Sequence, residues 1–279
     1  MSDTSASGEE PDFERRFGGV RRLYGDAALR RFQDARIVVV GLGGVGSWAV
    51  EALARSAIGR LRLIDLDMVA ESNVNRQIHA LDGAFGKAKT EAMAERVRAI
   101  DPACRVEMIE DFVTPENAAL LLGGDFDYLI DAIDQARAKA AIIAHCVRAG
   151  RPFVTAGGAG GRIDPARLAV ADLSRTVQDT LLAKVRSLLR KEHGFARDPK
   201  KTFGVPAVFS SEPARHPERG NAREPQAVSA GLSCAGYGSS VCVTAAFGFF
   251  AAGLALNHVA RAEGGSAVTP ARCACRSAQ

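Results

Sequence analysis

The sequence predicts a Rossmann-like α/β fold: a mostly parallel central sheet with helices on both faces and a C-terminal extension. Short apolar runs alternate with segments of helical periodicity from residue 37 to residue 155, which is typical of a parallel sheet joined by helices. A glycine-rich turn, residues 41–46, directly follows the first apolar run. The second apolar run leads into Asp65, an acid at the position where nucleotide-binding folds of this class use one.

Each element follows from a local pattern of apolar residues and from the glycines and prolines that end it. We expect strands at residues 37–40, 61–64, 105–109, 128–130, 153–155 and 168–172. We expect helices at residues 12–33, with a break at Gly18 and Gly19, and at 47–56, 88–100, 115–122 and 137–149. A further helix is expected over the apolar residues from Val177 to Leu189, ending near Gly194.

The domain organisation expected from these patterns is a single domain at residues 13–260. It is preceded by a disordered tail at 1–12 and followed by a polar tail at 261–279. Within the domain, residues 13–156 are the expected nucleotide-binding half, and residues 157–260 the half for substrate and dimer contacts.

Basic residues gather in two places, although the 279-residue chain has a formal net charge of only +4. Residues 15–31 hold six arginines and one aspartate, and residues 184–223 hold ten basic against four acidic residues. The second cluster overlaps residues 195–225, which lack periodicity and are too long for a simple connection, so we expect a functional or mobile loop there. Such clusters can attract a polyanion or can be solvated faces, and composition leaves both interpretations open.

Cysteines and apolar runs argue against a secreted, zinc-bound or membrane-spanning chain. The N-terminus is polar and acidic, so the six cysteines are expected to be reduced thiols in the cytoplasm. The lack of C-x-x-C pairs disfavours a four-cysteine zinc site, and Cys234 is interpreted as a small core residue rather than a catalytic thiol. Residues 241–256 carry no charge but are shorter than the ~20 residues of a membrane span. We therefore expect a core or interface helix without stable membrane insertion.

The glycine turn is the centre of the candidate nucleotide site. Gly41 can provide the tight turn, Gly43 the close approach of the backbone to a phosphate, and Gly46 the close packing of the following helix. The N-terminus of that helix offers free N–H groups and a partial positive charge. Asp65, 19 residues beyond Gly46, is placed to bind ribose hydroxyls.

The residues that follow distinguish a redox dinucleotide from a triphosphate with its magnesium ion. A triphosphate needs Arg and Lys near its outer phosphates and a carboxylate for the metal. Arg76 and Lys89 can supply the charges, and Asp134, after the fourth expected strand, can supply the carboxylate. Singly, Arg76 could form a loop salt bridge, Asp134 could cap a helix, and His79 is interpreted as a packed loop histidine. Together these residues favour ATP and Mg²⁺.

The sequence resembles the E1-like adenylating superfamily, which includes the ubiquitin-activating enzymes and the thiamine and molybdopterin adenylyltransferases. The stretches that carry this resemblance are GLGGVGSWAVEALARSAIG, LIDLDMVAESNVNRQIHAL, GKAK, DFVTP and IDAID. RFGGVRRLYG, TAGGAGGRIDP and TAAFGF are similar to the branch of the superfamily that acts on a modified adenosine in tRNA. The resemblance extends from about Arg15 to about His258.

The resemblance also implies roles for individual residues. It assigns the phosphate turn to Gly41, Gly43, Gly44 and Gly46. It assigns the nucleotide's ribose and phosphates to Asp65, Asp67, Asn73, Arg76 and Lys89, and Mg²⁺ to Asp134. Arg76, Lys89 and Asp134 would be catalytic. The superfamily also uses an arginine from the N-terminal arm of a partner subunit; Arg16 is the nearest candidate, which implies a homodimer.

The activity implied by the resemblance is the ATP-dependent cyclisation of N6-threonylcarbamoyladenosine in tRNA anticodon loops, through an acyl-adenylate. The partners would be that tRNA and possible proteins of a cysteine-desulfurase system. The alternative is adenylation of the C-terminal carboxylate of a ubiquitin-like sulfur carrier, which the missing zinc cysteines disfavour. Two other functions, an NAD-dependent oxidoreductase and a non-catalytic nucleotide sensor, remain alternatives, and the basic residues beyond Asp65 disfavour both.

Overall fold

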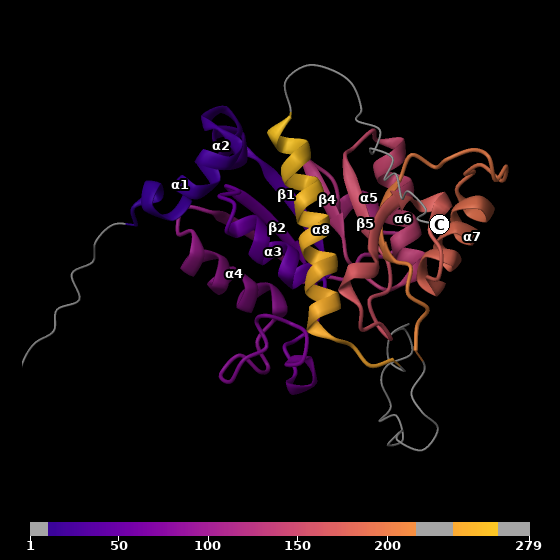
Figure 1. Cartoon of the computed structure of the whole chain (residues 1–279), viewed down its shortest axis with the longest axis horizontal. Coiled ribbons are helices and arrows are strands. Elements are labelled where there is room, and N and C mark those ends of the chain that lie inside the picture. Colours follow the sequence, from indigo (N-terminus) through magenta and orange to yellow (C-terminus); the bar gives the residue numbers. More distant parts are fainter. Residues whose placement is uncertain (1–10, 216–236, 262–279) are drawn as a thin grey trace, which may run out of the picture.

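The computed structural model describes residues 11–215 and 237–261, which form a seven-stranded sheet flanked by helices (Figure 1). The strands are β1 (Arg36–Val40), β2 (Arg60–Ile64), β3 (Arg105–Ile109), β4 (Tyr128–Asp131), β5 (Phe153–Ala156), β6 (Leu168–Asp172) and β7 (Pro206–Ser210). The helices are α1 (Phe13–Tyr24), α2 (Asp26–Asp34), α3 (Gly46–Ala54), α4 (Lys89–Ile100), α5 (Ala118–Leu121), α6 (Ala136–Arg148), α7 (Thr180–Glu192) and α8 (Val241–Ala260). The strand order is β3-β2-β1-β4-β5-β7-β6, and β6 alone among these strands is antiparallel to its neighbour. The predicted fold class is confirmed.

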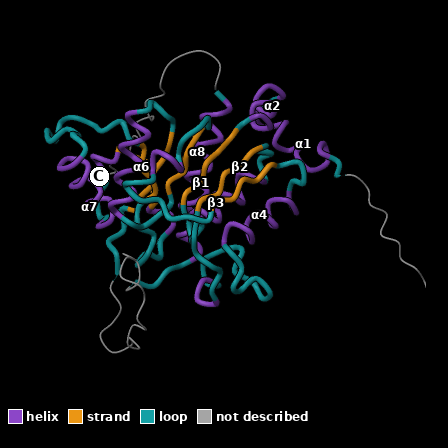
Figure 2. Tube along the Cα trace, turned by 180° about the vertical axis from the view of Figure 1, so that it is seen from behind, coloured by secondary structure: helices purple, strands orange, loops and turns teal. Residues whose placement is uncertain are grey.

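The sheet is buried on both faces because successive side chains of its central strands enter different helix layers. In β1, Ile37 and Val39 belong to the apolar cluster with α2, α3, α4 and α8. Val38 and Val40 belong to the cluster with α5, α6 and α7. A strand covered on both faces is apolar throughout, which is why β1 is an unbroken apolar run in the sequence. Figure 2 shows the strands side by side, with helices on either side of the sheet.

Helix α8 crosses the front of the sheet in Figure 1 and packs closely on α3. At Gly248 a Cβ atom would stand 2.5 Å from the carbonyl oxygen of Val45 and 2.9 Å from the nitrogen of Ala49, so only glycine allows this approach. With 20 residues and a mean hydropathy of 1.5, α8 has the length and composition of a membrane span, and half of its most apolar window is buried within the described residues. It forms part of the core, as the sequence predicted.

The N-terminal arm differs from the prediction in where its helix breaks. Helix α1 continues through Gly18 and Gly19, and the break falls at Gly25, where φ is +84°. A left-handed conformation ends a helix and is open to glycine without strain. Gly18 and Gly19 keep helical conformations, so the expected break there is wrong.

The expected loop at residues 195–225 contains a strand that the sequence analysis missed. Strand β7 lies between β5, to which it is parallel, and β6, to which it is antiparallel. Ala207 and Val208 are fully buried. Because β7 is covered on both faces it shows no alternation of polar and apolar residues, and its five residues were too few to stand out. Residues 216–225 of the expected loop, most of both tails and Cys234 lie outside the described residues.

The topology brings the carboxyl ends of the parallel strands β1, β2, β4 and β5 to one edge of the sheet. In an open sheet of this type, ligands bind at that edge, where the strand order reverses. Here the reversal falls between β1 and β4, since β1 is followed by β2 on one side and β4 on the other. The glycine turn follows β1, and the loop that carries Asp134 follows β4.

Candidate functional site

The glycine turn is closed so tightly that larger residues cannot replace two of its glycines. Gly41 has φ of +87°, and a Cβ atom there would stand 2.9 Å from Cγ2 of Ile133. A Cβ atom at Gly46 would stand 1.8 Å from the carbonyl oxygen of Gly41. The first contact places the loop after β4 directly against the turn, and the second places the start of α3 against it.

The outer side of the glycine turn is open toward a ligand. At Gly43 a Cβ atom would meet no described atom within 4 Å. Helix α3 begins at Gly46, and its N-cap residue, Val45, makes no side-chain hydrogen bond to the helix. The Ser47 N–H already donates to the Gly43 carbonyl at 3.1 Å, so an anion would be bound by the other N–H groups at the start of α3, where the helix dipole favours one.

Asp65 ties the end of β2 to the glycine turn. Its Oδ2 accepts a hydrogen bond from the Leu42 N–H at 2.6 Å, and its Oδ1 accepts one from the Asp67 N–H at 2.8 Å. Burial raises the pKa of the Asp65 carboxyl, while the charge of Lys89 and these two N–H groups act in the opposite sense. A carboxylate oxygen has more than one lone pair, so the same group can also accept ribose hydroxyls.

Lys89 and Asp67 form an ion pair beside the turn. The Lys89 Nζ lies 2.7 Å from Oδ2 of Asp67, and the Lys89 side chain is 7% exposed, whereas that of Asp67 is 49% exposed. Lys89 is the first residue of α4, and its N–H also donates to the Asp67 carbonyl at 3.0 Å. The sequence analysis named both residues for the nucleotide but did not predict that they pair with each other.

The crossover loop, residues 66–88, carries the other two predicted phosphate ligands. The Asn73 Oδ1 accepts a hydrogen bond from the Ala70 N–H at 3.0 Å, which fixes the short turn Glu71–Asn73. Arg76 lies over the glycine turn, since a Cβ atom at Gly44 would stand 3.1 Å from Cγ of Arg76. The structure thus brings the Arg76 side chain to the phosphate turn from 30 residues away in the sequence.

The Arg76 backbone and guanidinium are both held in place. Trp48 Nε1, on α3, donates to the Arg76 carbonyl at 2.9 Å. One terminal nitrogen of the Arg76 guanidinium donates to the Ser72 carbonyl and to Oδ1 of Asn75, both at 2.9 Å. The sequence had also allowed a salt bridge between Arg76 and an acid of the loop. The structure instead pairs the guanidinium with these two neutral oxygens.

Asp134 lies in the loop between β4 and α6 and is half-buried. The N-cap residue of α6 is Gln135, directly after Asp134, and the Gln135 side chain makes no capping hydrogen bond. Within the described residues no group of three metal-ligating side chains gathers. Mg²⁺ is normally held by one or two carboxylates together with substrate phosphates, so a single carboxylate beside the phosphate turn fits this ion.

A buried ion pair that the sequence analysis missed supports this loop. Asp131, the last residue of β4, lies 2.8 Å from the Nζ of Lys139, and both side chains are 0% exposed. The Thr155 Oγ1 donates to the same carboxylate at 2.7 Å. Burial raises the pKa of Asp131, and the Lys139 charge opposes that shift. The signal in the sequence was a lysine within the apolar helix 137–149.

Arg16 does not reach the site within its own chain. Its guanidinium donates to the Ile100 carbonyl at 2.6 Å, at the C-terminal end of α4. Lys89 lies at the opposite end of the same helix. A role for Arg16 therefore requires a partner subunit and stays a prediction.

His79 belongs to the crossover loop and its side chain is buried. It is 3% exposed, and neither ring nitrogen has a hydrogen-bond partner among the described residues. Burial, with the charges of Lys89 and Arg96, lowers its pKa to about 4. The sequence predicted a packed loop histidine, and the structure shows one.

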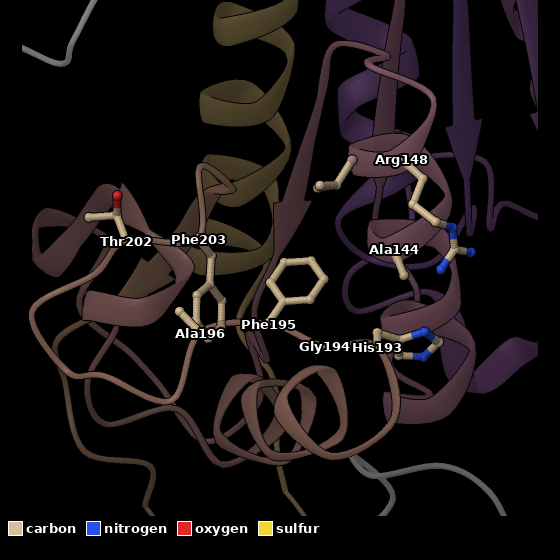
Figure 3. Close-up of a pocket in the computed structure, with 9 residues that line it drawn as sticks. Ala144, Arg148, His193, Gly194, Phe195, Ala196, Thr202 and Phe203 are labelled. Atoms are coloured by element: carbon tan, nitrogen blue, oxygen red, sulfur yellow. The ribbon is translucent and has the colours of Figure 1, made fainter.

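A second hollow lies away from the nucleotide site (Figure 3). It has a volume of about 260 Å³ and is lined by the C-terminal half of α6 and by residues 193–196 and 202–203. Phe195 and Phe203 pack edge to face there, and the Arg190 guanidinium lies 5.2 Å from the Phe203 ring centre. Asp134 precedes the other end of α6, so this hollow and the glycine turn lie at opposite ends of the helix.

Comparison with known proteins agrees with this geometry. Residues 17–177, more than half of the chain, match the ThiF family. The chain belongs to the ThiF family. The resemblance to adenylating enzymes is thereby confirmed, and the glycine turn, the crossover loop and Asp134 all fall within the matched residues.

Among ThiF-family relatives, a tRNA threonylcarbamoyladenosine dehydratase of Haemophilus influenzae is 51% identical over 86% of this chain and 91% of its own length. The Escherichia coli protein of the same name is also 51% identical, over 88% of this chain and 94% of its own. The crystal structure of the Escherichia coli dehydratase in complex with ATP matches with a TM-score of 0.80 and 49% identity, covering 88% of this chain and 94% of that one.

Proposed function

We propose that this ThiF-family protein cyclises N6-threonylcarbamoyladenosine in tRNA at the cost of ATP. The observation that carries the proposal is the meeting of three parts at one sheet edge: the open glycine turn, Arg76 across Gly44, and the Asp134 loop against Gly41. The relatives that bear this activity in their names match almost the whole chain at about half identity. The Escherichia coli relative has been crystallised in complex with ATP and, separately, in complex with AMP.

The first chemical step activates a carboxylate. An oxygen of the threonyl carboxylate attacks the α-phosphorus of ATP, a new P–O bond forms, and the bond to the β-phosphate breaks to release pyrophosphate. The Arg76 guanidinium and Lys89 would stabilise the charge that grows on the phosphates, and Asn73 would add a hydrogen bond. Asp65 would hold the ribose, with Asp67 beside it. Mg²⁺ bound at Asp134 would supply further charge neutralisation.

The second step closes the ring. A ureido atom of the same side chain attacks the activated carbonyl, AMP leaves with the electron pair of the C–O bond, and the ureido proton is lost. The nucleoside has then lost one water overall. Because the attack is intramolecular, proximity supplies much of the rate, and the protein needs mainly to hold the reacting atoms together.

The assembly and location follow the same proposal. A homodimer would bring Arg16 of the N-terminal arm to the site of the partner subunit. The chain would act in the cytoplasm, where its tRNA substrate is found, with possible partners among cysteine-desulfurase proteins. The division into a nucleotide-binding half at residues 13–156 and a substrate half at 157–260 belongs to this proposal too.

The test is direct. The protein is incubated with Mg-ATP and tRNA containing N6-threonylcarbamoyladenosine, the tRNA is digested, and its nucleosides are weighed. We expect an ATP-dependent loss of one water from that nucleoside, abolished in Asp134→Ala. An unchanged nucleoside, with folded protein that binds ATP, would contradict the proposal and would favour a protein carrier as the adenylated partner.

A further inference from the structure

Asn75 makes a bridge between two distant parts of the chain at the edge of the site. Its Nδ2 donates to the carbonyl oxygen of Ser239 at 3.2 Å and lies 3.1 Å from the Ser239 Oγ. Its Oδ1 accepts from the Arg76 guanidinium at 2.9 Å. Asn75 and Ser239 are 164 residues apart in the sequence, and the side-chain amide is used on both of its sides. Asn75 was not among the predicted site residues.

Ser239 belongs to a bridging segment, residues 237–240, that leads directly into α8. Thr244, in the first turns of α8, lies against the glycine turn, since a Cβ atom at Gly44 would stand 3.3 Å from Cβ of Thr244. In Figure 1 the beginning of α8 and the crossover loop lie together at the lower edge of the molecule. The bridging segment therefore runs beside the phosphate turn and not at a remote surface.

The same bridging segment holds a second loop, which we call the acceptor loop, residues 157–161. The Gly161 N–H donates to the Gly238 carbonyl at 2.7 Å, and a Cβ atom at Gly161 would stand 3.0 Å from Cδ1 of Tyr237. The acceptor loop directly follows β5, the neighbour of β4 in the sheet. It therefore borders the Asp134 loop at the ligand edge.

The other side of the acceptor loop is fixed by a buried arginine. Arg162 is 4% exposed and donates to the carbonyls of Gly158, Gly160 and Gln178. Its guanidinium also lies 3.7 Å from Oδ2 of Asp179, which accepts from the Gly158 N–H at 2.9 Å. The loop is thus rigid on the core side, and the bridging segment sets its position on the open side.

The geometry points to Asn75 as a positioning residue that joins the phosphate-binding arm to the acceptor loop. Through Oδ1 it aims Arg76 at the phosphates, and through Nδ2 it holds the bridging segment that supports Gly161. The two halves of the reaction, the nucleotide and the carboxylate that attacks it, must meet within bonding distance. One side chain that ties their supports together fixes that distance. This inference rests on the proposed function.

The experiment compares Asn75→Ala, Asn75→Asp and the wild type in the cyclisation assay. Asn75→Ala removes both bonds and is expected to lower kcat/KM for the tRNA by about 10- to 100-fold, since misplacement of about 1 Å has effects of that size. Asn75→Asp keeps an oxygen toward Arg76 but has no N–H for Ser239, and is expected to be defective as well. Asn75→Gln, which keeps both groups, is expected to recover part of the activity.

A matched control removes a similar tie at the opposite edge of the sheet. The Asp127 carboxylate accepts from the Arg36 N–H at 2.7 Å, joining the starts of β4 and β1. Asp127→Ala is expected to change the unfolding midpoint without changing KM for ATP or tRNA. Asn75→Ala is expected to change the unfolding midpoint only slightly and to raise the KM values for ATP and tRNA.

The outcomes separate the inference from the proposed function. If the wild type does not alter the nucleoside, the proposed function fails, and ATP binding measured by titration calorimetry still tests whether Asn75 positions Arg76. If the wild type is active and Asn75→Ala matches it in kcat and in both KM values, the positioning role is wrong. If Asn75→Asp alone matches the wild type, Asn75 serves Arg76 only and the link to the acceptor loop is wrong.

Discussion

The Arg76 side chain lies so close to Gly44 that a Cβ atom at residue 44 would stand only 3.1 Å from Cγ of Arg76. A glycine at residue 44 therefore does more than permit a turn: it leaves room for the one arginine of the crossover loop beside the glycine turn. The two residues come from different elements, and under the proposed function an outer phosphate of ATP would lie where they meet.

Gly44→Ala is expected to weaken ATP binding with little loss of stability. The added methyl would press on the flexible Arg76 stem and on Cβ of Thr244, at 3.1 and 3.3 Å, so each must give way by a few tenths of an ångström, and the backbone at Gly44 is not in the left-handed region. Isothermal titration with Mg-ATP measures the effect, which we expect to be a rise in Kd of about tenfold, or ~1.4 kcal/mol. Gly46→Ala is the contrast, because its methyl would meet the Gly41 carbonyl oxygen at 1.8 Å and destabilise the fold itself. Equal ATP affinity in Gly44→Ala and the wild type would show that the Arg76 placement is irrelevant.

Lys89→Met is expected to reduce turnover by about 100-fold or more, the size found when one preorganised charge-stabilising group is removed. The stability cost should be small, because the partner left behind, Asp67, has a half-exposed side chain that water can solvate. Single-turnover cyclisation and urea unfolding measure the two effects separately. Asp67→Asn serves as the control for loss of the pair without loss of the positive charge. A Lys89→Met protein with full turnover would remove Lys89 from the catalytic group.

Lys139→Met is expected to lower the stability of the fold strongly, whereas Lys89→Met lowers mainly the turnover. It would leave the Asp131 carboxylate buried and without its ion-pair partner, a change that typically costs about 3–5 kcal/mol. Urea unfolding followed by circular dichroism gives the free energy of unfolding. The double variant Asp131→Leu with Lys139→Met removes both charges and should recover most of that loss. A Lys139→Met protein as stable as the wild type would mean that Asp131 is protonated and needs no partner.

Local patterns predicted the parts of the site that belong to a single stretch of chain. Short segments between residues 37 and 155 encode the glycine turn, Asp65 and the alternation of strands and helices. Strand β7 was missed because it is short and buried on both faces. The Asp131–Lys139 pair and the Asn75–Ser239 bridge were missed because they exist only after α6 packs on β4 and α8 packs on α3. Which side chains contact each other in such pairs depends on how the elements pack, and the periodicity of a sequence carries no information about that.

His79 is expected to make the protein less stable as the pH falls below about 6.5. In the unfolded chain the imidazole has its ordinary pKa of 6.5, whereas in the folded protein burial lowers the pKa to about 4. Between these values only the unfolded chain binds the proton, so stability falls with pH and the loss is complete below about pH 4. It amounts to about 3 kcal/mol at most.

The measurement compares the free energy of unfolding of the wild type and His79→Leu from pH 8 to pH 4. The difference between the two is expected to be constant above pH 7 and to move in favour of the variant as the pH falls. A constant difference down to pH 4 would show that His79 keeps its ordinary pKa in the folded protein. Other titrating groups contribute equally to both proteins, so the comparison isolates this histidine.

Helix α7 is expected to hold tRNA phosphates. Lys184 and Lys191 lie two turns apart on it and are both exposed, on the helix that begins beside the acceptor loop, where Asp179 binds the Gly158 N–H. Neutralising a phosphate contact weakens binding to all sequences alike and reduces its salt dependence. Lys184→Gln with Lys191→Gln should therefore lower tRNA affinity and flatten the plot of log K against log salt by about 1–2 units of slope. ATP binding should not change.

The control for α7 is Arg98→Gln with Arg105→Gln, two exposed arginines at the end of α4 and the start of β3. This variant loses the same net charge, so any effect of overall charge on tRNA binding appears in both proteins, and a contact effect appears only in the α7 variant. Equal losses of affinity in the two variants would mean that the basic segment at 184–223 is a solvated face that attracts the polyanion only through the field of the whole protein. A loss confined to the α7 variant, with unchanged turnover at saturating tRNA, would place the RNA along α7, because phosphate contacts there position the substrate without touching the reacting atoms.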